Sequence, residues 1–302
     1  MADRRLQVFF TVAKQLSFTK AAELLFMTQP AVTFQVKQLE EHFNTRLFER
    51  SHGRISLTPA GQLVYQYADR ILALSDELET RMGELTGGIA GPLSVGASTT
   101  IAEFMIPHVL GEFKSAYPQV QPRLVVGNSE TIENRVADHS LDIGLIESPS
   151  HLSSLRTETL CEDELLMICA PGHPLAEAAA VTPKQLVQHP YVSREPGSGT
   201  REFADQFFAS AGVSPEELNI VMELGSPEAV KGVVEAGVGF GVVSRVTVEK
   251  ELTLKRLVAV PFRPKLTRLM SMVYPKEKFR SRLLSTFVEF AKARLQKPVS
   301  KA

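Results

Sequence analysis

Five residues near the N-terminus have side chains that can read DNA bases and a spacing that places them on one face of a helix. They are Gln29, Pro30, Thr33, Phe34 and Lys37, and helical neighbours lie three and four positions apart. An amide can pair with adenine, a hydroxyl or a ring can pack on a thymine methyl group, and an ammonium can contact guanine or phosphate. The pattern favours a helix that enters a DNA groove. The alternative is a solvated face on an ordinary three-helix core.

A second set of polar residues follows the expected strands of the later chain, at the strand ends where open α/β sheets bind ligands. Its four groups supply hydroxyl, amide and guanidinium donors, and glycines let backbone N–H groups approach a ligand. The groups comprise Ser98, Thr99 and Thr100; Asn128; Glu147; and Arg194, Glu195, Ser198, Gly199, Thr200 and Arg201. Helix capping explains any one group by itself, but four groups at equivalent strand ends predict a site for a small anionic ligand.

The same residues do not support catalysis. Gly197-Ser198-Gly199 lacks the spacing of a hydrolase nucleophile, and the histidines are scattered along the chain. Cys161 and Cys169 form no CxxC pair, so we expect no metal and no cofactor. Buried small side chains are the simplest interpretation of the cysteines; a thiol switch is the minor alternative, because a bend could join residues eight apart. We therefore expect that the chain is not an enzyme.

Three short helices must hold the first set of residues in place. Apolar positions three and four apart predict helices over residues 6–14 and 17–25 and from residue 29 onward. Ser17 and Thr28 are good N-caps, and a proline suits the first turn of the third helix. The residues expected to face the core are Leu6, Phe9, Phe10, Ala13, Ala21, Ala22, Leu24, Leu25, Ala31, Val32, Val36, Leu39 and Phe43. Residues 18–37 therefore read as a helix-turn-helix, with its turn at residues 26–27.

Two short strands are expected next, at residues 47–50 and 55–58, around a turn at residues 51–53. Arg50 and Arg54 flank this wing tip and suit contacts with phosphates or with a minor groove; the alternative is that both are merely solvated. Residues 1–58 carry eight Lys and Arg against five Asp and Glu, whereas the whole chain has a net charge of −1. A basic head on an acidic body is typical of a nucleic-acid reader with a second task.

Residues 59–85 read as one long helix that begins after Thr58. Its apolar positions recur at steps of three and four, close to a coiled-coil seam. They are Ala60, Val64, Tyr67, Ile71, Leu74, Leu78, Met82 and Leu85. We expect this stripe to form a dimer rather than to pack on the rest of its own chain, because residues 87–92 read as a flexible hinge. A dimer also suits the reading of two DNA half-sites.

From residue 92 onward, expected strands alternate with expected helices, which indicates an α/β fold with largely parallel sheets. The strands are expected at residues 93–97, 123–126, 143–146, 165–169, 220–224, 239–243 and 269–274. The helices are expected at residues 101–117, 129–138, 200–211, 227–236 and 281–295. This order brings the polar strand-end groups toward one another.

The motif FxxVAxxxSFTxAAxxLxxTQPAVxxQVKQLExxxxxxLFER spans residues 9–50, and LTPAG follows at residues 57–61. This long motif resembles the LysR-type transcriptional regulators, and the resemblance covers nearly the whole chain. It implies a winged helix-turn-helix DNA-binding domain at residues 1–58, a linker and dimerisation helix at 59–87, and an effector-binding domain at 88–302. The last is similar to periplasmic binding proteins, with lobe I at about residues 91–162 and 268–302 and lobe II at about 163–267. The resemblance places the crossing strands near residues 162–168 and 264–269.

The strings GNSET, REPGSGTR and ELGSPEAVK resemble a branch of this family that is concerned with sulfur assimilation and carbon fixation. That resemblance implies an oxyanion or a phosphorylated metabolite as the effector. Glu147 and Glu195 would repel a bare dianion unless Arg194 or Arg201 compensates. The implied partners are double-stranded promoter DNA, the effector, and further copies of the chain as a homodimer and a homotetramer.

With 302 residues, 44% of them hydrophobic, the chain can form a small module and one or two larger domains. The first fifteen residues do not resemble a signal peptide, and no apolar stretch is long enough to span a membrane, so we expect a cytoplasmic protein. Two rivals to a regulator stay open. One is a solute-binding module with an interaction head, which the missing signal disfavours; the other is an enzyme that uses the cleft, which lacks a nucleophile–base pair.

Overall fold

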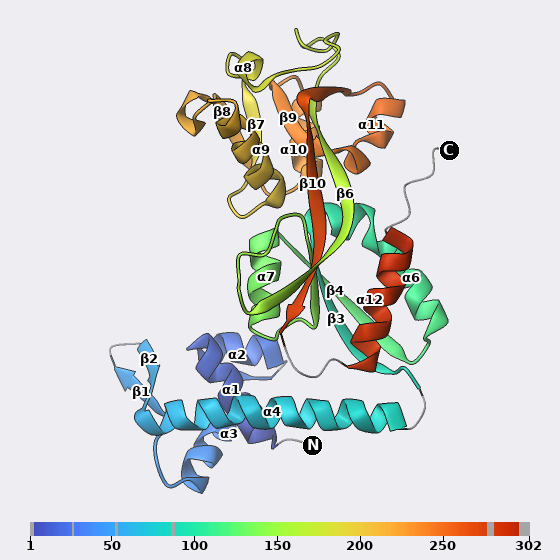
Figure 1. Cartoon of the computed structure of the whole chain (residues 1–302). Helices are drawn as coiled ribbons and strands as arrows, with labels where there is room; N and C mark the ends of the chain where they lie inside the picture. The colour runs from blue at the N-terminus through green and yellow to red at the C-terminus, as the bar shows by residue number, and fades with distance from the viewer. Residues whose placement is uncertain (1–2, 26, 52–53, 86–87, 277–280, 296–302) are drawn as a thin grey trace. The chain divides into compact units, whose positions relative to one another are not determined.

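The computed structural model describes residues 3–25, 27–51, 54–85, 88–276 and 281–295. The chain divides into two compact units, Met1–Gly87 and Gly88–Ala302, which we call the head and the body (Figure 1). Across the described residues, every helix is too short or too polar to span a membrane.

The head is a three-helix core with a two-stranded wing and one long helix. Its elements are α1 (Arg4–Gln15), α2 (Phe18–Leu25), α3 (Gln29–His42), β1 (Phe48–Ser51), β2 (Arg54–Leu57) and α4 (Pro59–Leu85). The two strands pair antiparallel. The core contains the apolar positions that repeat three and four apart, among them Leu6, Phe9, Val12, Ala21, Val32, Val36 and Leu39. The winged helix-turn-helix predicted from the sequence is confirmed.

Some side chains of the head lie elsewhere than expected. Leu24 is 55% exposed and Phe43 is 45% exposed, so neither belongs to the core. The buried face of the short helix α2 is centred on its alanines, which leaves Leu24 at its edge, and Phe43 follows the last turn of α3. Phe10 is half-buried and stacks on Tyr65 of α4, with 4.9 Å between the ring centroids. Thr28 holds the N-cap position of α3 but makes no side-chain capping bond.

Three hydrogen bonds position the wing and the start of α4: one joins the wing to α3, and Thr58 makes the other two. The carboxylate of Glu40 accepts the backbone N–H of Leu47 at 2.8 Å. The hydroxyl of Thr58 accepts the N–H of Gly61 at 2.9 Å and donates to the carbonyl of Arg46 at 2.8 Å. A Cβ atom at position 61 would lie 2.0 Å from the Leu47 carbonyl oxygen, so α4 can begin this close to the wing only because residue 61 is glycine.

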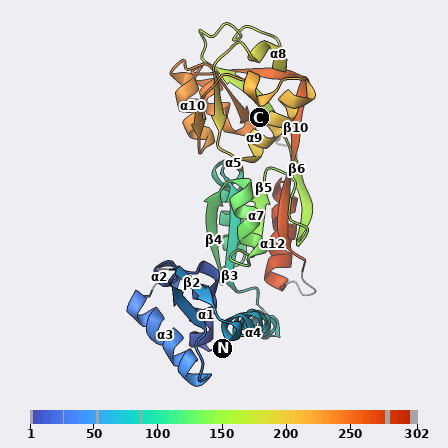
Figure 2. The ribbon, with the colours of Figure 1, turned by 90° about the vertical axis from the view of Figure 1, so that its left-hand side faces the viewer.

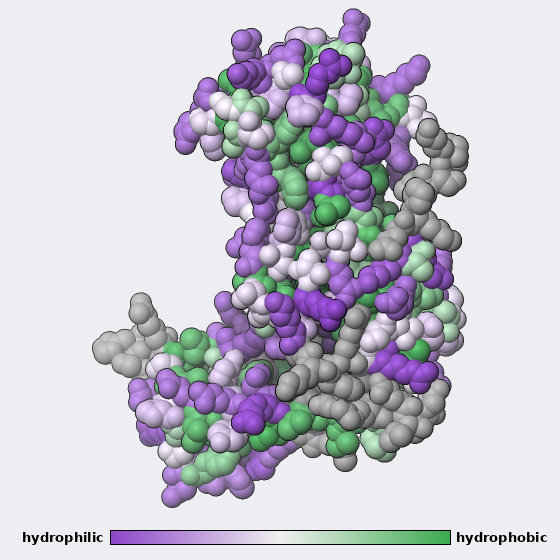
Figure 3. Space-filling view, in the orientation of Figure 1, coloured by the Kyte–Doolittle hydropathy of each residue, from purple (hydrophilic) through white to green (hydrophobic). Residues whose placement is uncertain are grey.

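The apolar stripe of α4 has two parts. Ala60 and Val64 pack against the head core. The second part, which we call the α4 stripe, is between 46% and 63% exposed; it consists of Tyr67, Ile71, Leu74, Leu78 and Met82. Apolar residues are visible along α4 in the space-filling view (Figure 3). The side chain of Leu85 lies outside the described residues.

The body contains an eight-stranded sheet with the order β4-β3-β5-β10-β6-β9-β7-β8. Its strands are β3 (Gly91–Ser98), β4 (Val120–Gly127), β5 (Ile143–Ile146), β6 (Leu155–Cys169), β7 (Tyr191–Arg194), β8 (Ile220–Leu224), β9 (Phe240–Ser244) and β10 (Val258–Pro275). β3 pairs in parallel with β4 and β5, and β7 in parallel with β8 and β9. β10 pairs antiparallel with β5 and β6. The sheet is therefore mixed, which corrects the expectation of largely parallel sheets.

β6 and β10 are the two strands that run through both lobes (Figures 1 and 2). They contain 15 and 18 residues, and they pair from Leu155 opposite Pro275 to Cys169 opposite Val258. The expected crossing region 162–168 lies within this paired stretch; so does 264–269, except that Pro264 and Lys265 fall in a register shift between Pro261 and Leu266. Lobe I contains β3, β4 and β5, and lobe II contains β7, β8 and β9, so the expected two-lobed fold is confirmed.

Helices cover both faces of the sheet in each lobe. In lobe I, α5 (Thr99–Phe104), α6 (Ile106–Ala116) and α12 (Arg282–Leu295) pack on one face and α7 (Ser129–Ala137) on the other. In lobe II, α8 (Pro183–Leu186) and α9 (Gly199–Ser210) cover one face, and α10 (Pro227–Glu235) and α11 (Glu249–Thr253) the other. Short 3-10 helices occupy Pro215–Glu217 and Arg245–Thr247.

The single helix expected at residues 101–117 is interrupted at Met105, between α5 and α6. Pro107 explains the break, because a proline inside a helix removes an N–H donor and its ring clashes with the carbonyl four residues earlier. In the structure, Pro107 instead lies in the first turn of α6, where that N–H would have no helical partner.

Candidate functional site

The outer face of α3 carries the residues that were expected to read bases. Gln29, Pro30 and Phe34 are exposed, and Thr33 is half-buried. The amide of Gln29 donates to the Thr33 hydroxyl at 3.0 Å, so the two groups are held side by side on this face. Lys37 is 71% exposed at its side chain and lies 3.6 Å from Glu41.

The opposite face of α3 fixes this helix in the head. Val32, Val36 and Leu39 are buried at 0%, 2% and 3% exposure, so the outer residues are presented from a packed element. At the wing, the backbone of Arg50 pairs with Ile55 and that of Arg54 with Ser51. The side chains of Arg50 and Arg54 lie outside the described residues.

The second set of expected residues gathers where the two lobes meet. Ser98 ends β3, Asn128 follows β4, Glu147 follows β5 and Arg194 ends β7. We call this region the lobe junction and define it as Ser98–Thr100, Asn128, Glu147, Arg194, Glu195 and Ser198–Thr200, together with Asp163, Ser193 and Arg268. Hydrogen bonds bridge the lobes here directly.

The carboxylate of Glu147 lies at the centre of the lobe junction. Its Oε1 accepts the backbone N–H of Thr100 at 3.1 Å. Its Oε2 accepts the Thr200 hydroxyl at 3.2 Å and Nη1 of Arg268 at 2.8 Å. Burial is the largest influence on this carboxyl and opposes its ionisation, but the charges of Arg268 and Arg194 and the nearby Ser98 and Thr100 hydroxyls together outweigh burial and hold the pKa of Glu147 below its usual value. Glu147 is therefore an ionised carboxylate on donors from both lobes and a crossing strand.

Arg268 and Asp163 face each other across the two long strands, at paired positions of β10 and β6. The side chain of Arg268 is fully buried, and its Nε lies 2.8 Å from Asp163 Oδ2. Arg268 also donates to the Thr200 hydroxyl at 3.0 Å, and the Ser244 hydroxyl donates to Asp163 at 2.6 Å. Burial lowers the pKa of Arg268, but the neighbouring Glu147 and Asp163 carboxylates outweigh it and raise that pKa. Neither Arg268 nor Asp163 was expected from the sequence as a site residue.

Arg194 joins lobe II to Thr99 of lobe I. Its Nη2 donates to the Thr99 hydroxyl at 3.1 Å. The same guanidinium forms a bidentate pair with Glu195, at 2.8 Å from Nε and 3.0 Å from Nη2. Its side chain is 3% exposed. The charge of Arg194 is therefore already balanced by its sequence neighbour.

Two further contacts bring the lobes together. The side-chain amide of Asn128 donates to the carbonyl of Pro196 at 3.2 Å. A Cβ atom on Gly199 would lie 2.9 Å from the Cβ of Glu147. The glycine at 199 thus permits the close approach of α9 to the chain after β5.

Two of the expected residues contribute differently. Ser198 is buried at the N-cap of α9 but makes no side-chain capping bond. Arg201 contacts Glu223 at 2.5 Å, Asp205 at 3.5 Å and the carbonyl of Arg194 at 3.0 Å. The expectation that Arg194 or Arg201 compensates the acidic residues holds for Arg194 with Glu195. For Glu147, the main compensating charge is Arg268, and Arg194 contributes a smaller share.

Several buried polar atoms of the lobe junction have no hydrogen-bond partner among the residues that the structure describes. They are Ser98 Oγ, Thr100 Oγ1, Ser193 Oγ and Arg268 Nη2. The Ser98 and Thr100 hydroxyls lie close enough to Glu147 to lower its pKa further, without a hydrogen bond of standard geometry. An unpaired buried polar group costs about 1–3 kcal/mol, and such groups are commonly satisfied by water or a ligand. The lobe junction therefore has the donors for a small polar molecule.

The two cysteines lie on one strand, β6. Burial raises the pKa of the Cys161 and Cys169 thiols to about 11, which disfavours the reactive thiolate. Eight residues of extended strand span about 26 Å, so the bend that would have brought these cysteines together is absent from this strand.

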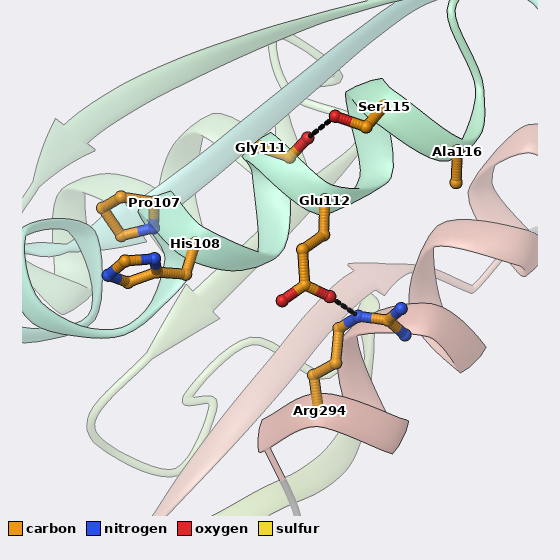
Figure 4. Close-up of a pocket in the computed structure, with 7 residues that line it drawn as sticks. All are labelled: Pro107, His108, Gly111, Glu112, Ser115, Ala116 and Arg294. Atoms are coloured by element: carbon orange, nitrogen blue, oxygen red, sulfur yellow. Dashed lines mark hydrogen bonds and ion pairs between the residues drawn. The ribbon is translucent and has the colours of Figure 1, made fainter.

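A hollow of about 790 Å³ lies on the surface of lobe I. It is lined by α6 and by Arg294 of α12 (Figure 4). Arg294 contacts Glu112, and the Ser115 hydroxyl donates to the Gly111 carbonyl at 3.0 Å. None of the residues expected from the sequence as site residues lines this hollow.

Comparison with known proteins identifies both units. Residues 4–62 match the model of the bacterial regulatory helix-turn-helix protein, lysR family, and residues 86–296 match the LysR substrate binding domain. The chain is similar to a probable RuBisCO transcriptional regulator of Phaeodactylum tricornutum, with 33% identity over 288 residues and 94% of each chain covered. It is also similar to the HTH-type transcriptional regulator CysL of Bacillus subtilis, with 34% identity over 247 residues and 82% of each chain covered.

A solved structure resembles the body. It is the regulatory domain of CcmR from Synechocystis PCC6803 in complex with 2-PG, with 27% identity and a TM-score of 0.63. The match covers 68% of this chain and 98% of that chain. With these matches over its head and its body, the chain belongs to the LysR family: it is a DNA-binding transcriptional regulator with an effector-binding domain.

Proposed function

We propose that this protein binds promoter DNA through the outer face of α3 and that a small anionic metabolite at the lobe junction controls this binding. The observation that carries the first part is the exposed row of Gln29, Phe34 and Lys37 on a helix whose other face is buried in the head core. A helix held in this way can enter a major groove as a rigid unit.

Each residue of the proposed DNA interface has a role that follows from its chemistry. Gln29, Thr33, Phe34 and Lys37 contact base edges, since amide, hydroxyl, methyl-packing and ammonium groups serve that purpose. Thr28 at the N-cap and Pro30 in the first turn form the N-terminal end of α3, where a recognition helix approaches the DNA. Arg50 and Arg54 of the wing contact phosphates, which position the protein without reading sequence.

We assign assembly to the α4 stripe. Five large apolar side chains on one side of a helix are exposed, and a second copy of the same helix would bury them in a coiled-coil-like seam. The working division is then residues 1–58 for DNA, 59–87 for dimerisation and 88–302 for the effector, with two dimers in a tetramer. DNA binding requires the compartment that contains the promoter, which in a bacterium is the cytoplasm.

For the effector, we favour an oxyanion or a phosphorylated metabolite. The Thr100 N–H, the Thr200 hydroxyl and the Arg268 guanidinium already hold one carboxylate, that of Glu147, and donors of these kinds also bind phosphates. The similar regulatory domain of CcmR was solved with 2-PG. The relatives include a probable RuBisCO transcriptional regulator, which supports the branch that the sequence resembles and the ligand class implied by it.

A gel-shift titration of the full chain on the DNA upstream of its own gene tests the regulator. We expect a specific complex that an excess of unrelated DNA does not remove. Equal affinity for unrelated DNA at 150 mM salt would contradict sequence-specific binding, since non-specific contacts are weak at that ionic strength. Adding 2-phosphoglycolate, the 2-PG of the CcmR structure, to the same titration tests the proposed effector class.

A further inference from the structure

We infer that Glu147 is a built-in competitor of the effector: its carboxylate fills the oxyanion position of the lobe junction, and an anionic effector binds by displacing it. This inference rests on the effector site proposed above and specifies how that site is regulated. It makes Glu147 a residue that sets affinity and specificity, because the effector must exchange with a carboxylate of the protein itself.

The first support is the set of donors that Glu147 engages. A backbone N–H from α5, a hydroxyl from α9 and a guanidinium from β10 converge on the two oxygens of one carboxylate, at 3.1, 3.2 and 2.8 Å. These are charge-assisted contacts of the kind that bind carboxylate and phosphate ligands. The donors come from segments far apart in sequence, so the fold assembles an anion position around a residue of the chain.

The second support is the charge of the buried cluster. Two carboxylates, Glu147 and Asp163, share the single guanidinium of Arg268, and all three side chains are at most 3% exposed. The nearby Arg194 is already paired with Glu195. A dianion added to this cluster would bring further negative charge into a site that is buried from solvent, which is costly. Release of Glu147 removes one negative charge as the ligand enters.

The third support is that Arg268 has a second carboxylate partner and an unused donor. Asp163 holds its Nε at 2.8 Å independently of Glu147, so the guanidinium stays in place when Glu147 leaves. Its Nη2 and the Thr100 hydroxyl have no hydrogen-bond partner among the described residues. An oxyanion with three or four oxygens can use these donors in addition to those that Glu147 vacates, whereas a carboxylate has only two oxygens.

The exchange also lets the effector change how the two lobes are connected. Glu147 follows β5 in lobe I, and its partner Thr200 belongs to α9 in lobe II, so the contact between them is an internal link across the junction. A ligand replaces that link with its own contacts. If the released form of Glu147 is about one molecule in ten or fewer, the apparent affinity for the effector is reduced about tenfold or more.

The test is calorimetric titration of the full chain with inorganic sulfate and with 2-phosphoglycolate, in the wild type and in Glu147→Gln. Glutamine keeps the size of the side chain but lacks the charge, and Arg268 retains Asp163 as a counter-ion. We expect Glu147→Gln to bind at least one of the two probes about tenfold more tightly than the wild type. Glu147→Ser, which leaves more space, should do the same and serves if the glutamine variant does not fold.

Asp163→Asn is the matched control, because it removes a carboxylate from the same guanidinium. In this variant Glu147 is the remaining carboxylate that contacts Arg268, so the Glu147 carboxylate is bound more firmly. The affinity for the probes should therefore fall or stay unchanged. If Glu147→Gln and Asp163→Asn increase the affinity for the probes equally, the cause is the loss of one negative charge near Arg268 and not the release of a competitor. If neither Glu147 variant binds the probes more tightly, there is no oxyanion position at Glu147. Either result overturns the inference. A gel shift of each variant without ligand shows separately whether the chain binds its operator.

Discussion

At the scale of single residues, Arg268 is the charge that holds the lobe junction together. It contacts Glu147 at 2.8 Å and Asp163 at 2.8 Å and is fully buried. Replacing it with Met would leave two buried carboxylates without a counter-ion, and breaking a buried pair in this way costs about 3–5 kcal/mol. We expect Arg268→Met to lower the free energy of unfolding of the body by about that amount, as measured by urea titration.

The comparison for this variant is Arg245→Met, which removes an arginine that is 56% exposed and contacts Glu164 at 2.6 Å. An exposed ion pair contributes roughly 0–1 kcal/mol, so this variant should unfold at nearly the wild-type urea concentration. If both variants lose the same stability, the buried cluster has no special role in holding the lobes.

The sequence indicated part of this cluster and not the rest. Glu147 could be predicted as a site residue because it directly follows an expected strand, and polar residues at strand ends were expected to lie together. Arg268 lies inside a strand, and its only local signal is that it alternates with Leu266 and Met270, both buried. A charged residue at an inward position of a strand must have a buried partner. That its partners would be Glu147 and Asp163 depends on the pairing of β10 with β6, which a single sequence does not fix.

At the scale of elements, α3 presents the proposed base-reading surface. Gln29→Ala removes an exposed amide that also bonds to Thr33 at 3.0 Å, and Thr33→Ala removes the hydroxyl partner. We expect each change to weaken operator binding by about 1–3 kcal/mol and to relax base preference at one position, as is usual for a good base contact. Fluorescence anisotropy with the operator and single-base variants of it measures both effects.

Gln121→Ala is the control for this surface, because Gln121 is an exposed glutamine on β4 in the body. It should leave operator affinity and base preference unchanged. Wild-type affinity in the two α3 variants would show that another part of the head reads the DNA.

The second element with a testable face is α4. Leu74 is 63% exposed and Leu78 is 48% exposed, although both belong to an apolar stripe. Leu74→Asp or Leu78→Asp would place unpaired charges in the seam between two copies, and buried unpaired charges are strongly unfavourable. We expect each variant to be a monomer by light scattering at concentrations where the wild type forms the proposed dimer.

In contrast, Gln66→Asp adds a charge to an exposed residue of α4 that is not part of the stripe, and it should remain dimeric. The melting temperature of each variant shows whether the head is still folded. A folded Leu74→Asp variant that stays dimeric would move the dimer interface away from α4.

Elements with a strong local pattern were predicted well, and those fixed by partners were not. The helix-turn-helix and the apolar seam of α4 follow from spacings of three and four residues, and short strands such as β5 follow from continuous apolar runs. The apolar run predicted β6 at residues 165–169, and the family resemblance placed a crossing strand near 162–168, but β6 begins at Leu155. Its first half contains charged residues and is defined by pairing with β10. The mixed character of the sheet has the same cause.

At the scale of the whole molecule, the head and the body are separate compact units, so a ligand in the body must act on DNA binding through the connection between units or through assembly. This requires that the effector prefer one arrangement of the lobes, since a ligand shifts an equilibrium only by its differential affinity for the two states. The coupling between effector and DNA is then a free energy that a change at the junction can remove while each unit stays folded.

The lobe junction offers two side chains for testing this coupling. The Thr200 hydroxyl contacts both Glu147 and Arg268, and the Thr100 hydroxyl has no partner among the described residues. We expect Thr100→Ala and Thr200→Ala to retain the wild-type affinity for the operator in the absence of ligand and to lose the response to 2-phosphoglycolate or to a related anion that the wild type recognises. Anisotropy titrations of operator DNA with and without the anion measure both quantities in one assay.

The control is Thr253→Ala, which removes an exposed threonine hydroxyl that bonds to the Glu249 carbonyl of α11. It should respond to the anion as the wild type does. The coupling lost in the two junction variants should be about 1–3 kcal/mol, the usual range between allosteric sites. A Thr100 or Thr200 variant that keeps the full response would place the effector elsewhere in the body, and one that loses operator binding without ligand would show that the head depends on the junction for its own fold.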